Sequence, residues 1–225
     1  MNHLFSSSRL ALLGSLAALT ALGACSERDL RPLNPCTFSV SAADIDIETV
    51  DEVDLLFMID NSGSMDEEQA SLADEIPVLV RTLASGELLN PDTGAVVREF
   101  PPVRSLRVGV ITSDMGTGGF SVPTCTNRRF GDDGLLINRG NVATDSRCMA
   151  TYPSFFEFER DPAASPESEA ARVSQLAVDV SCVAQLGIDG CGFEQQLDSI
   201  LKAVTPASSS LTFQEGTPGN GDVNR

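Results

Sequence analysis

Histidine is almost absent from this chain of 225 residues: His3 is the only one. Histidine is the commonest general base in enzymes and a frequent zinc ligand. His3 lies in a segment that we expect to be removed, so the mature chain lacks the imidazole of a Ser–His–Asp or Cys–His catalytic group and of a His-ligated zinc site. We therefore expect a protein that is not an enzyme.

Positive charge is also scarce, with 15 Lys and Arg against 32 Asp and Glu and a formal net charge of −17. Such a surface repels phosphate backbones, so we expect no nucleic-acid partner. An acidic surface suits the binding of a hard cation, although it also serves solubility alone. The apolar and charged fractions, 42% and 21%, are those of a globular protein, and the length predicts one domain with appendages.

The N-terminus has the layout of a secretory signal. Arg9 supplies a positive charge, and the apolar stretch from Leu10 to Leu22 is too short for a membrane span of about 20 residues. Residues 1–24 are thus expected to be a signal peptide; the alternative is an N-terminal hydrophobic core helix.

The signal ends in "LGAC", Leu22 to Cys25, which resembles a bacterial lipobox. The resemblance implies that Cys25 is the lipidated mature N-terminus, since several acyl chains hold a protein stably on a bilayer. The alternative is ordinary cleavage that leaves a free Cys25. We expect an exported protein anchored to a bacterial cell membrane, facing the periplasm or the cell surface, with residues 25–50 as a tether.

Five cysteines remain after Cys25, and export would allow them to form disulfides. They are Cys36, Cys125, Cys148, Cys182 and Cys191. The odd number leaves one without a partner in the chain, and sequence alone does not fix the pairing. We predict Cys125–Cys148 and Cys182–Cys191, with Cys36 left over. No C-x-x-C motif indicates a redox or zinc function.

The apolar pattern predicts alternating strands and helices. Leu55–Ile59 is a continuous apolar run, typical of a strand covered on both faces, and the helix that we expect over 66–85 contains Pro77, which predicts a kink or two abutting helices. The first turn of this helix is acidic, with Asp66, Glu67 and Glu68, as the helix dipole favours. Gly86 lies where a C-terminal cap is expected. The remaining expectations are strands at 95–100 and 105–114, a long disulfide-braced and partly irregular insertion at about 115–166, helices at 166–187 and 193–204, and a disordered tail at 205–225. In the helix at 193–204 the apolar residues are expected to point inward; they are Phe193, Leu197, Ile200, Leu201 and Val204.

This order predicts an α/β fold with a mostly parallel sheet flanked by helices, in which ligands bind beyond the carboxyl ends of strands. Asp60 stands at such an end, and "DNSGS", Asp60 to Ser64, resembles the D-x-S-x-S motif of von Willebrand factor type A domains. A buried strand precedes the motif, an acidic helix follows it, and "LRVGVITSD" occupies the place of the next core strand. The resemblance covers about residues 51–204 and implies a doubly wound, Rossmann-like fold.

In that family the motif forms a metal-ion-dependent adhesion site. The resemblance therefore implies that Asp60, Ser62 and Ser64 bind Mg²⁺ (or Mn²⁺ or Ca²⁺) and that a carboxylate of a partner protein completes the shell. The chemistry agrees, because hard divalent cations prefer oxygen ligands and Gly63 eases the turn between them. The alternative is that residues 62–64 only make a turn and an N-cap for the following helix.

The sequence departs from the family in two places. Cys191 or Gly192, in "DGCGFEQQL", falls where the family has a threonine, and the chain ends at Arg225 before the strand that brings the third-loop aspartate. We therefore expect an incomplete domain, and a remnant with a structural role and no working site is the alternative function. An exported metal-dependent hydrolase is a further alternative, which the absence of histidine and of a second carboxylate near the motif disfavours.

Two other motifs are weaker. "GTGG" at 116–119 lacks the full G-x-G-x-x-G pattern and does not lead into a helix, so a dinucleotide loop is not indicated. "GDDG" at 131–134 lacks the spacing of a calcium-binding loop and is typical of a surface turn.

Overall fold

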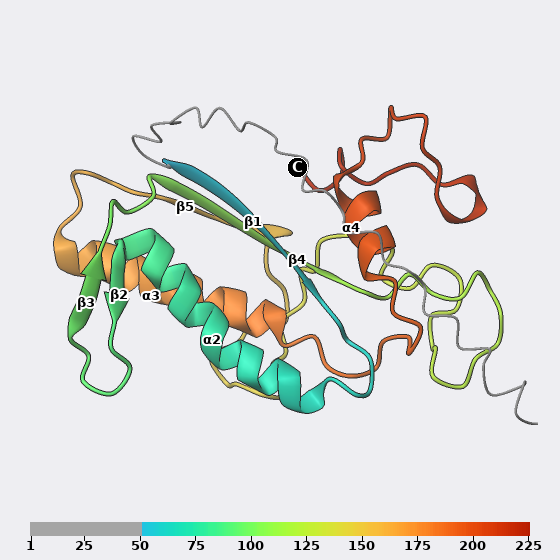
Figure 1. Cartoon of the computed structure of the whole chain (residues 1–225), viewed down its shortest axis with the longest axis horizontal. Coiled ribbons are helices and arrows are strands. Elements are labelled where there is room, and N and C mark those ends of the chain that lie inside the picture. Colours follow the sequence, from blue (N-terminus) through green and yellow to red (C-terminus); the bar gives the residue numbers. More distant parts are fainter. Residues whose placement is uncertain (1–50) are drawn as a thin grey trace, which may run out of the picture. The chain divides into compact units, whose positions relative to one another are not determined.

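The structure is a computed structural model that describes residues 51–225. It is a mixed α/β fold with a three-stranded sheet, a separate hairpin and three helices (Figure 1). In chain order the elements are β1 (Glu52–Ile59), α2 (Asp66–Ser85), β2 (Glu87–Leu89), β3 (Val96–Glu99), β4 (Ser105–Thr112), β5 (Phe155–Glu159), α3 (Pro166–Ala184), α4 (Gln196–Val204) and a 3₁₀ turn at Gln214–Gly216.

The sheet has the order β1–β4–β5 and is mixed rather than mostly parallel. β1 pairs with β4 in parallel, from Glu52 opposite Ser105 to Ile59 opposite Thr112, whereas β5 runs antiparallel to β4. The carboxyl ends of β1 and β4 therefore lie side by side. β5 falls inside the stretch expected to be a disulfide-braced and partly irregular insertion, where the sequence analysis predicted no strand.

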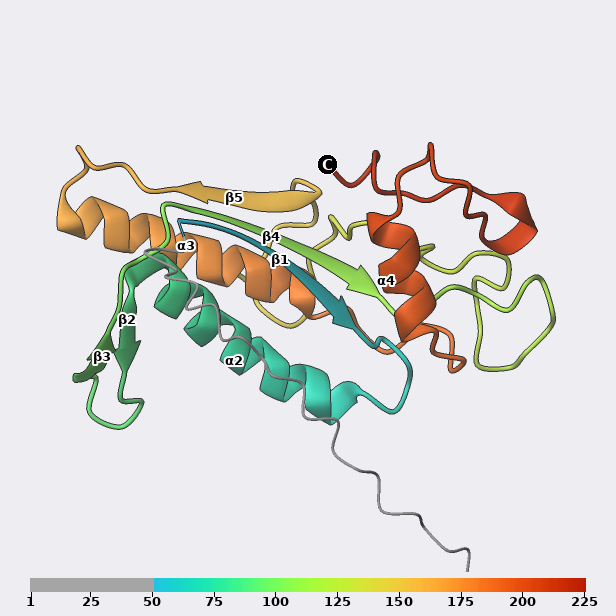
Figure 2. The same cartoon turned by 45° about the horizontal axis from the view of Figure 1, so that its top comes forward.

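Helices α2 and α3 cover one face of the sheet (Figure 2). Alternate residues of β1, namely Val53, Leu55 and Phe57, pack into the core on this side, as the two-residue period of a strand requires. From the helices, Ile76, Val80 and Val180 are at most 2% exposed. Burial of these apolar side chains is the main favourable term that holds the three elements together.

The opposite face of the sheet is polar near the start of its strands. Arg107 of β4 donates to Glu157 of β5 at 2.9 Å and lies 3.6 Å from Asp54 of β1. The same face becomes apolar farther along, where Leu56, Gly109 and Phe155 occupy neighbouring register positions. The expectation of a β1 strand buried on both faces was thus only half right: Leu56 is 39% exposed.

Pro77 lies inside a single helix, α2, and does not divide it. Proline lacks the N–H that would pair with the carbonyl four residues earlier, here Ala73. The hydroxyl of Ser181 on α3 donates to that carbonyl at 3.0 Å. The neighbouring helix thus satisfies the acceptor that Pro77 leaves free. The predicted C-terminal cap is confirmed, because Gly86 is left-handed and its N–H donates to Thr82.

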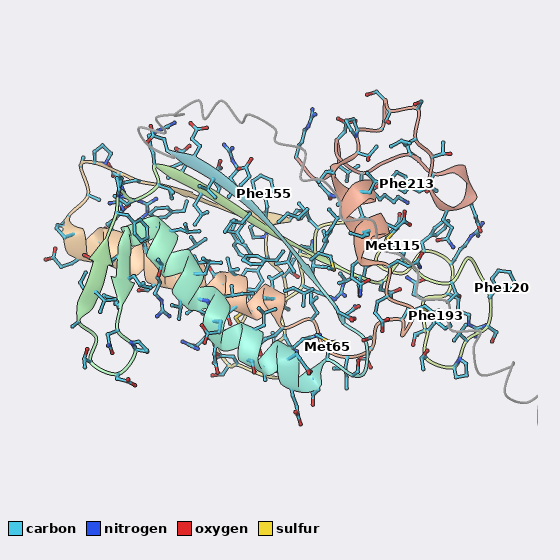
Figure 3. All side chains as sticks on the ribbon, viewed as in Figure 1. Met65, Met115, Phe120, Phe155, Phe193 and Phe213 are labelled. Atoms are coloured by element: carbon cyan, nitrogen blue, oxygen red, sulfur yellow. A yellow bond between two sulfur atoms is a disulfide. The ribbon has the colours of Figure 1, made fainter. Side chains whose placement is uncertain are left out.

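Helix α4 presents its polar side to the protein, contrary to the expectation that its apolar residues point inward. Ser199 and Lys202 are fully buried, whereas Leu197 is 84% exposed. The reason is the surface against which the helix packs, which offers oxygen acceptors: Ser199 donates to the carbonyl of Thr112, and Lys202 Nζ lies 2.5 Å from Asp133 Oδ1. Phe193 and Phe120 also protrude from loops near α4 (Figure 3).

The segment 205–225, expected to be disordered, packs against the domain. Asn220 donates to the carbonyl of Asp133 at 2.6 Å, and Asn224 donates to that of Gly134 at 3.0 Å. Thr217 accepts a hydrogen bond from buried Lys202 at 2.8 Å. Side-chain amides thus hold a segment that has few apolar residues, which explains why its composition indicated disorder.

The two disulfides join Cys125 to Cys191 and Cys148 to Cys182, so the predicted pairing was wrong although the four cysteines were right. Each cysteine pairs with the segment against which its backbone lies. Asn141 N–H donates to the carbonyl of Cys182, and Gly192 N–H donates to that of Thr124. Tertiary contacts therefore decided the pairing, not proximity in sequence.

Several expectations fall outside the described residues: the signal peptide at 1–24, the lipidation of Cys25, the tether at 25–50 and the state of Cys36. Among residues 51–225, no helix is both long and apolar enough to cross a membrane.

Candidate functional site

The segment Asp60–Ser64 connects the carboxyl end of β1 to α2, and Ser113 follows β4 directly beside it. The parallel pairing of the two strands brings these polar residues to one edge of the sheet. Ser113 N–H donates to the carbonyl of Ile59, which continues the ladder up to the site.

The Asp60 side chain is held from two directions. Its Oδ1 accepts a hydrogen bond from Ser62 N–H at 2.8 Å and another from the Ser113 hydroxyl at 3.0 Å. The other oxygen, Oδ2, has no donor among the described residues. The carboxylate is therefore oriented but keeps one oxygen free to bind a cation.

The two serines lie together beside Asp60. Their hydroxyl oxygens are 3.3 Å apart, and neither hydroxyl has another partner in the described part of the chain. Ser62 is only 2% exposed. Buried polar groups normally form good hydrogen bonds, whereas in the described residues this hydroxyl has only the Ser64 hydroxyl as a partner. A cation that accepted both oxygens as ligands would satisfy them.

The alternative role for these serines, a turn with an N-cap, is half realised. Met65 N–H donates to the carbonyl of Ser62, so the turn is present. The N-cap residue of α2 is Met65 itself, and no side chain caps the helix. Ser62 and Ser64 are thus left without the structural task that would otherwise account for their hydroxyls.

A cavity of about 510 Å³ opens over the serines. Its walls are the D-x-S-x-S segment, the segment after β4 and the segment between α3 and α4. They contribute three groups of residues: Ser62, Gly63 and Ser64; Pro123, Thr124 and Thr126; and Ile188, Asp189, Gly190, Gly192 and Glu194. The polar atoms of these side chains are hydroxyl and carboxylate oxygens, the donor type that Mg²⁺, Mn²⁺ and Ca²⁺ prefer. The residues present therefore fit a hard divalent cation.

Gln69 of α2 forms hydrogen bonds both with the segment Asp60–Ser64 and with Gly187. Its side-chain amide donates to the carbonyls of Asp60 and Gly187, both at 2.8 Å, and accepts from Gly187 N–H at 3.1 Å. The buried Gln69 side chain thus links the segment Asp60–Ser64 to the residues that directly follow α3. The sequence offered a weak signal for it, a glutamine on the first turns of a helix that directly follows the motif.

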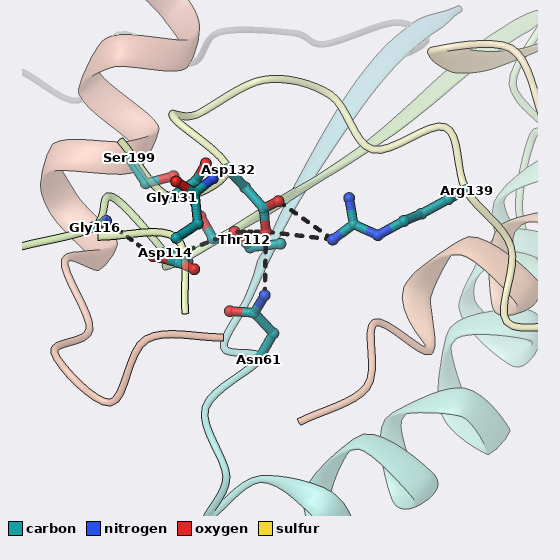
Figure 4. Close-up of polar contacts among 9 residues, drawn as sticks. Asn61, Thr112, Asp114, Gly116, Gly131, Asp132, Arg139 and Ser199 are labelled. Carbon is teal, nitrogen blue, oxygen red and sulfur yellow. Dashed lines mark hydrogen bonds and ion pairs between the residues drawn. The ribbon is translucent and has the colours of Figure 1, made fainter. Parts of the chain in front are cut away.

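Asp132 fixes the segment from the other side (Figure 4). Its Oδ2 accepts from Asn61 Nδ2 at 3.1 Å and from the Thr112 hydroxyl at 2.9 Å, and Arg139 lies 3.3 Å from its Oδ1. Asp132 belongs to "GDDG", which the sequence indicated to be a surface turn. The turn is real, but Asp132 points inward and joins the strand ends.

Asp114, two residues beyond β4, is 5% exposed. Burial raises the pKa of its carboxyl group, and the nearby charge of Asp132 acts in the same direction, against the hydrogen bond from Gly116 N–H at 2.9 Å. A side chain at Gly131 would meet this carboxylate, since a Cβ there would lie 2.2 Å from Asp114 Oδ1. Glycine, with φ of +64°, is therefore required at that position.

Asp114 also lies close to the Cys125–Cys191 sulfurs, with potential ligand atoms all within 4.8 Å of one another. Both sulfurs are bonded to each other, so they are not available as ligands here. Cys191, which with Gly192 is one of the two positions where the resemblance would place a threonine, uses its side chain in this bond.

The structure therefore places two of the three residues predicted from sequence, Ser62 and Ser64, in the lining of one cavity. Asp60 lies beside them and accepts the hydrogen bond from Ser62 N–H. That they bind a metal remains a prediction. No protein-family model, no curated protein and no solved structure matches this chain.

Proposed function

We propose that this protein binds a divalent cation, Mg²⁺ first and Mn²⁺ or Ca²⁺ in its place, at Asp60, Ser62 and Ser64. The observation that supports the proposal best is the buried Ser62 hydroxyl beside an oriented carboxylate. Within residues 51–225 this hydroxyl has one partner, the Ser64 hydroxyl at 3.3 Å, and one carboxylate oxygen of Asp60 accepts no hydrogen bond. Neither serine caps α2.

The wider proposal is a von Willebrand factor A-like domain in which the bound cation recruits a partner protein through a carboxylate. A mixed sheet is compatible with it, because doubly wound sheets often carry an antiparallel strand at one edge. The cation would supply a positive centre with replaceable water in an acidic surface. The lipid anchor at Cys25 and a place on a bacterial membrane belong to the same proposal.

A second candidate is a structural remnant without a working site. It is favoured by the use of Cys191 in a disulfide, because Cys191 or Gly192 falls where the family has a threonine ligand and neither supplies a hydroxyl. In that case the site residues would only brace the strand ends. Neither proposal includes catalysis.

Titration of the purified chain with Mg²⁺ and Mn²⁺, followed by calorimetry and by thermal melting, tests the first proposal. A ligand at 100 times its dissociation constant stabilises the folded state by about 2.7 kcal/mol. We expect Asp60→Ala to lose both the heat of binding and the stabilisation while its melting without metal stays close to wild type. The control is Asp74→Ala, which removes an exposed carboxylate from α2 and should respond as wild type.

A wild-type chain that shows neither heat nor stabilisation would favour the remnant. Metal binding that survives in Asp60→Ala would place the cation elsewhere and reject the site.

A further inference from the structure

We propose that Glu194, on the segment between α3 and α4, supplies a second carboxylate to the cation bound by Asp60, Ser62 and Ser64. This inference rests on the proposed function and names a ligand that the D-x-S-x-S pattern does not contain. It makes the cation site a product of two segments that are more than 120 residues apart in the chain.

The segment 188–195 is fixed directly to the metal-site candidate. Gly190 N–H donates to the carbonyl of Asn61 at 2.9 Å, and Gln195 N–H donates to that of Ser113 at 3.0 Å. Ser113 is the residue whose hydroxyl holds Asp60. Glu194 is thus the sequence neighbour of Gln195, whose backbone contacts Ser113, the residue that orients Asp60.

The same segment is also held covalently. Cys191 is bonded to Cys125, and Gly192 N–H donates to the carbonyl of Thr124 at 3.2 Å. The segment 188–195 is therefore joined both to the segment after β4 and to the segment Asp60–Ser64. A ligand on such a wall loses little conformational freedom when it binds a cation, which favours its participation.

Two carboxylates of this wall line the cavity, Asp189 and Glu194. Asp189 is exposed, whereas Glu194 is half-buried. The Glu194 carboxylate has no hydrogen bond or ion pair within residues 51–225, and the cavity lining includes no lysine or arginine. Partial burial of an unpaired acidic side chain is less favourable than full hydration, and a cation shared with the buried Ser62 hydroxyl would compensate for it.

A second carboxylate changes what the site can recognise. Asp60 and Glu194 together would neutralise the charge of a divalent cation, and affinity for Ca²⁺ depends on the number of charged ligands. With Glu194 bound, the cation would keep fewer positions for water or for the carboxylate of a partner protein.

The test compares three variants that each remove one negative charge: Glu194→Gln, Asp189→Asn and Asp198→Asn. Asp198 lies on α4 and lines a neighbouring cavity together with Glu194, but not the cavity of Ser62 and Ser64. The dissociation constants of Mn²⁺ and Ca²⁺ are measured by calorimetry. The luminescence lifetime of Tb³⁺ in H₂O and D₂O then reports the water bound to the cation.

We expect Glu194→Gln to raise the dissociation constants of Mn²⁺ and Ca²⁺ by at least roughly 10- to 100-fold, because loss of a residue that merely supports a metal ligand already costs that much. Its Tb³⁺ complex should hold more water, because water takes the place of the carboxylate. Asp189→Asn and Asp198→Asn should retain wild-type water content and nearly wild-type affinity. All three should melt as wild type without metal.

The inference fails if Glu194→Gln binds as wild type, or if Asp189→Asn weakens binding equally with unchanged bound water, since the effect would then be one of overall charge. These outcomes differ from failure of the proposed function, in which the wild-type chain itself binds no cation or Asp60→Ala has no effect.

Discussion

Asp114 shows how a single carboxyl group at the strand ends influences stability. It is buried, and burial raises its pKa in the folded chain above the value of about 3.9 that an unfolded chain would have. The folded state therefore holds this proton at a pH where the unfolded state has released it. By linkage, the contribution of Asp114 to the free energy of unfolding decreases as the pH rises from about 4 through the folded pKa, and is constant above it.

The variant Asp114→Asn cannot titrate and should lack this decrease, while its amide oxygen can still accept from Gly116 N–H. We expect the free energy of unfolding of the variant, minus that of wild type, to grow between pH 4 and the folded pKa. Urea unfolding at a series of pH values measures this difference. Parallel pH curves for the two proteins would show that Asp114 titrates alike in both states.

At the scale of the elements, the fit between α2 and α3 depends on one hydroxyl. Ser181→Ala should leave the carbonyl of Ala73 without a donor, because Pro77 has no N–H to offer. An unsatisfied buried acceptor costs roughly 1–3 kcal/mol. This hydrogen bond is part-buried, so we expect a loss at the lower end of that range, about 1 kcal/mol, in chemical denaturation. Ser71→Ala is the matched control: Ser71 also donates to a carbonyl of α2, that of Glu67, but is exposed and should change stability little. Equal losses in the two variants would contradict the assignment.

The elements also show where sequence patterns suffice. The β1 strand, the α2 helix with its Gly86 cap, and the position of Asp60, Ser62 and Ser64 at a strand end were predictable, because each depends on local residues. The orientation predicted for helix α4 was wrong. Leu197 is exposed and Lys202 is buried because Lys202 pairs with Asp133, which is distant in sequence. The inward position of Asp132 and the cavity wall around Glu194 likewise depend on how distant segments meet.

At the scale of the whole molecule, the disulfide pairing gives a direct test of the fold. Trypsin without reduction should yield one product in which peptide 173–202 is joined to both 108–128 and 148–160, because Cys182 and Cys191 bond to different segments. Mass spectrometry identifies it. The pairing expected from sequence would instead leave 173–202 with an internal bond, separate from the other two peptides, and its detection would reject this fold.

The two bonds are nested: Cys148–Cys182 lies within the loop that Cys125–Cys191 closes. Synthesis presents the four cysteines in the order 125, 148, 182 and 191. In a chain exported as it is made, the thiols of Cys125 and Cys148 would meet an oxidant before either of their correct partners exists, and any bond formed between them would have to be broken again by thiol–disulfide exchange. Oxidation during synthesis is therefore expected to give the native pairing more slowly than oxidation of the complete chain.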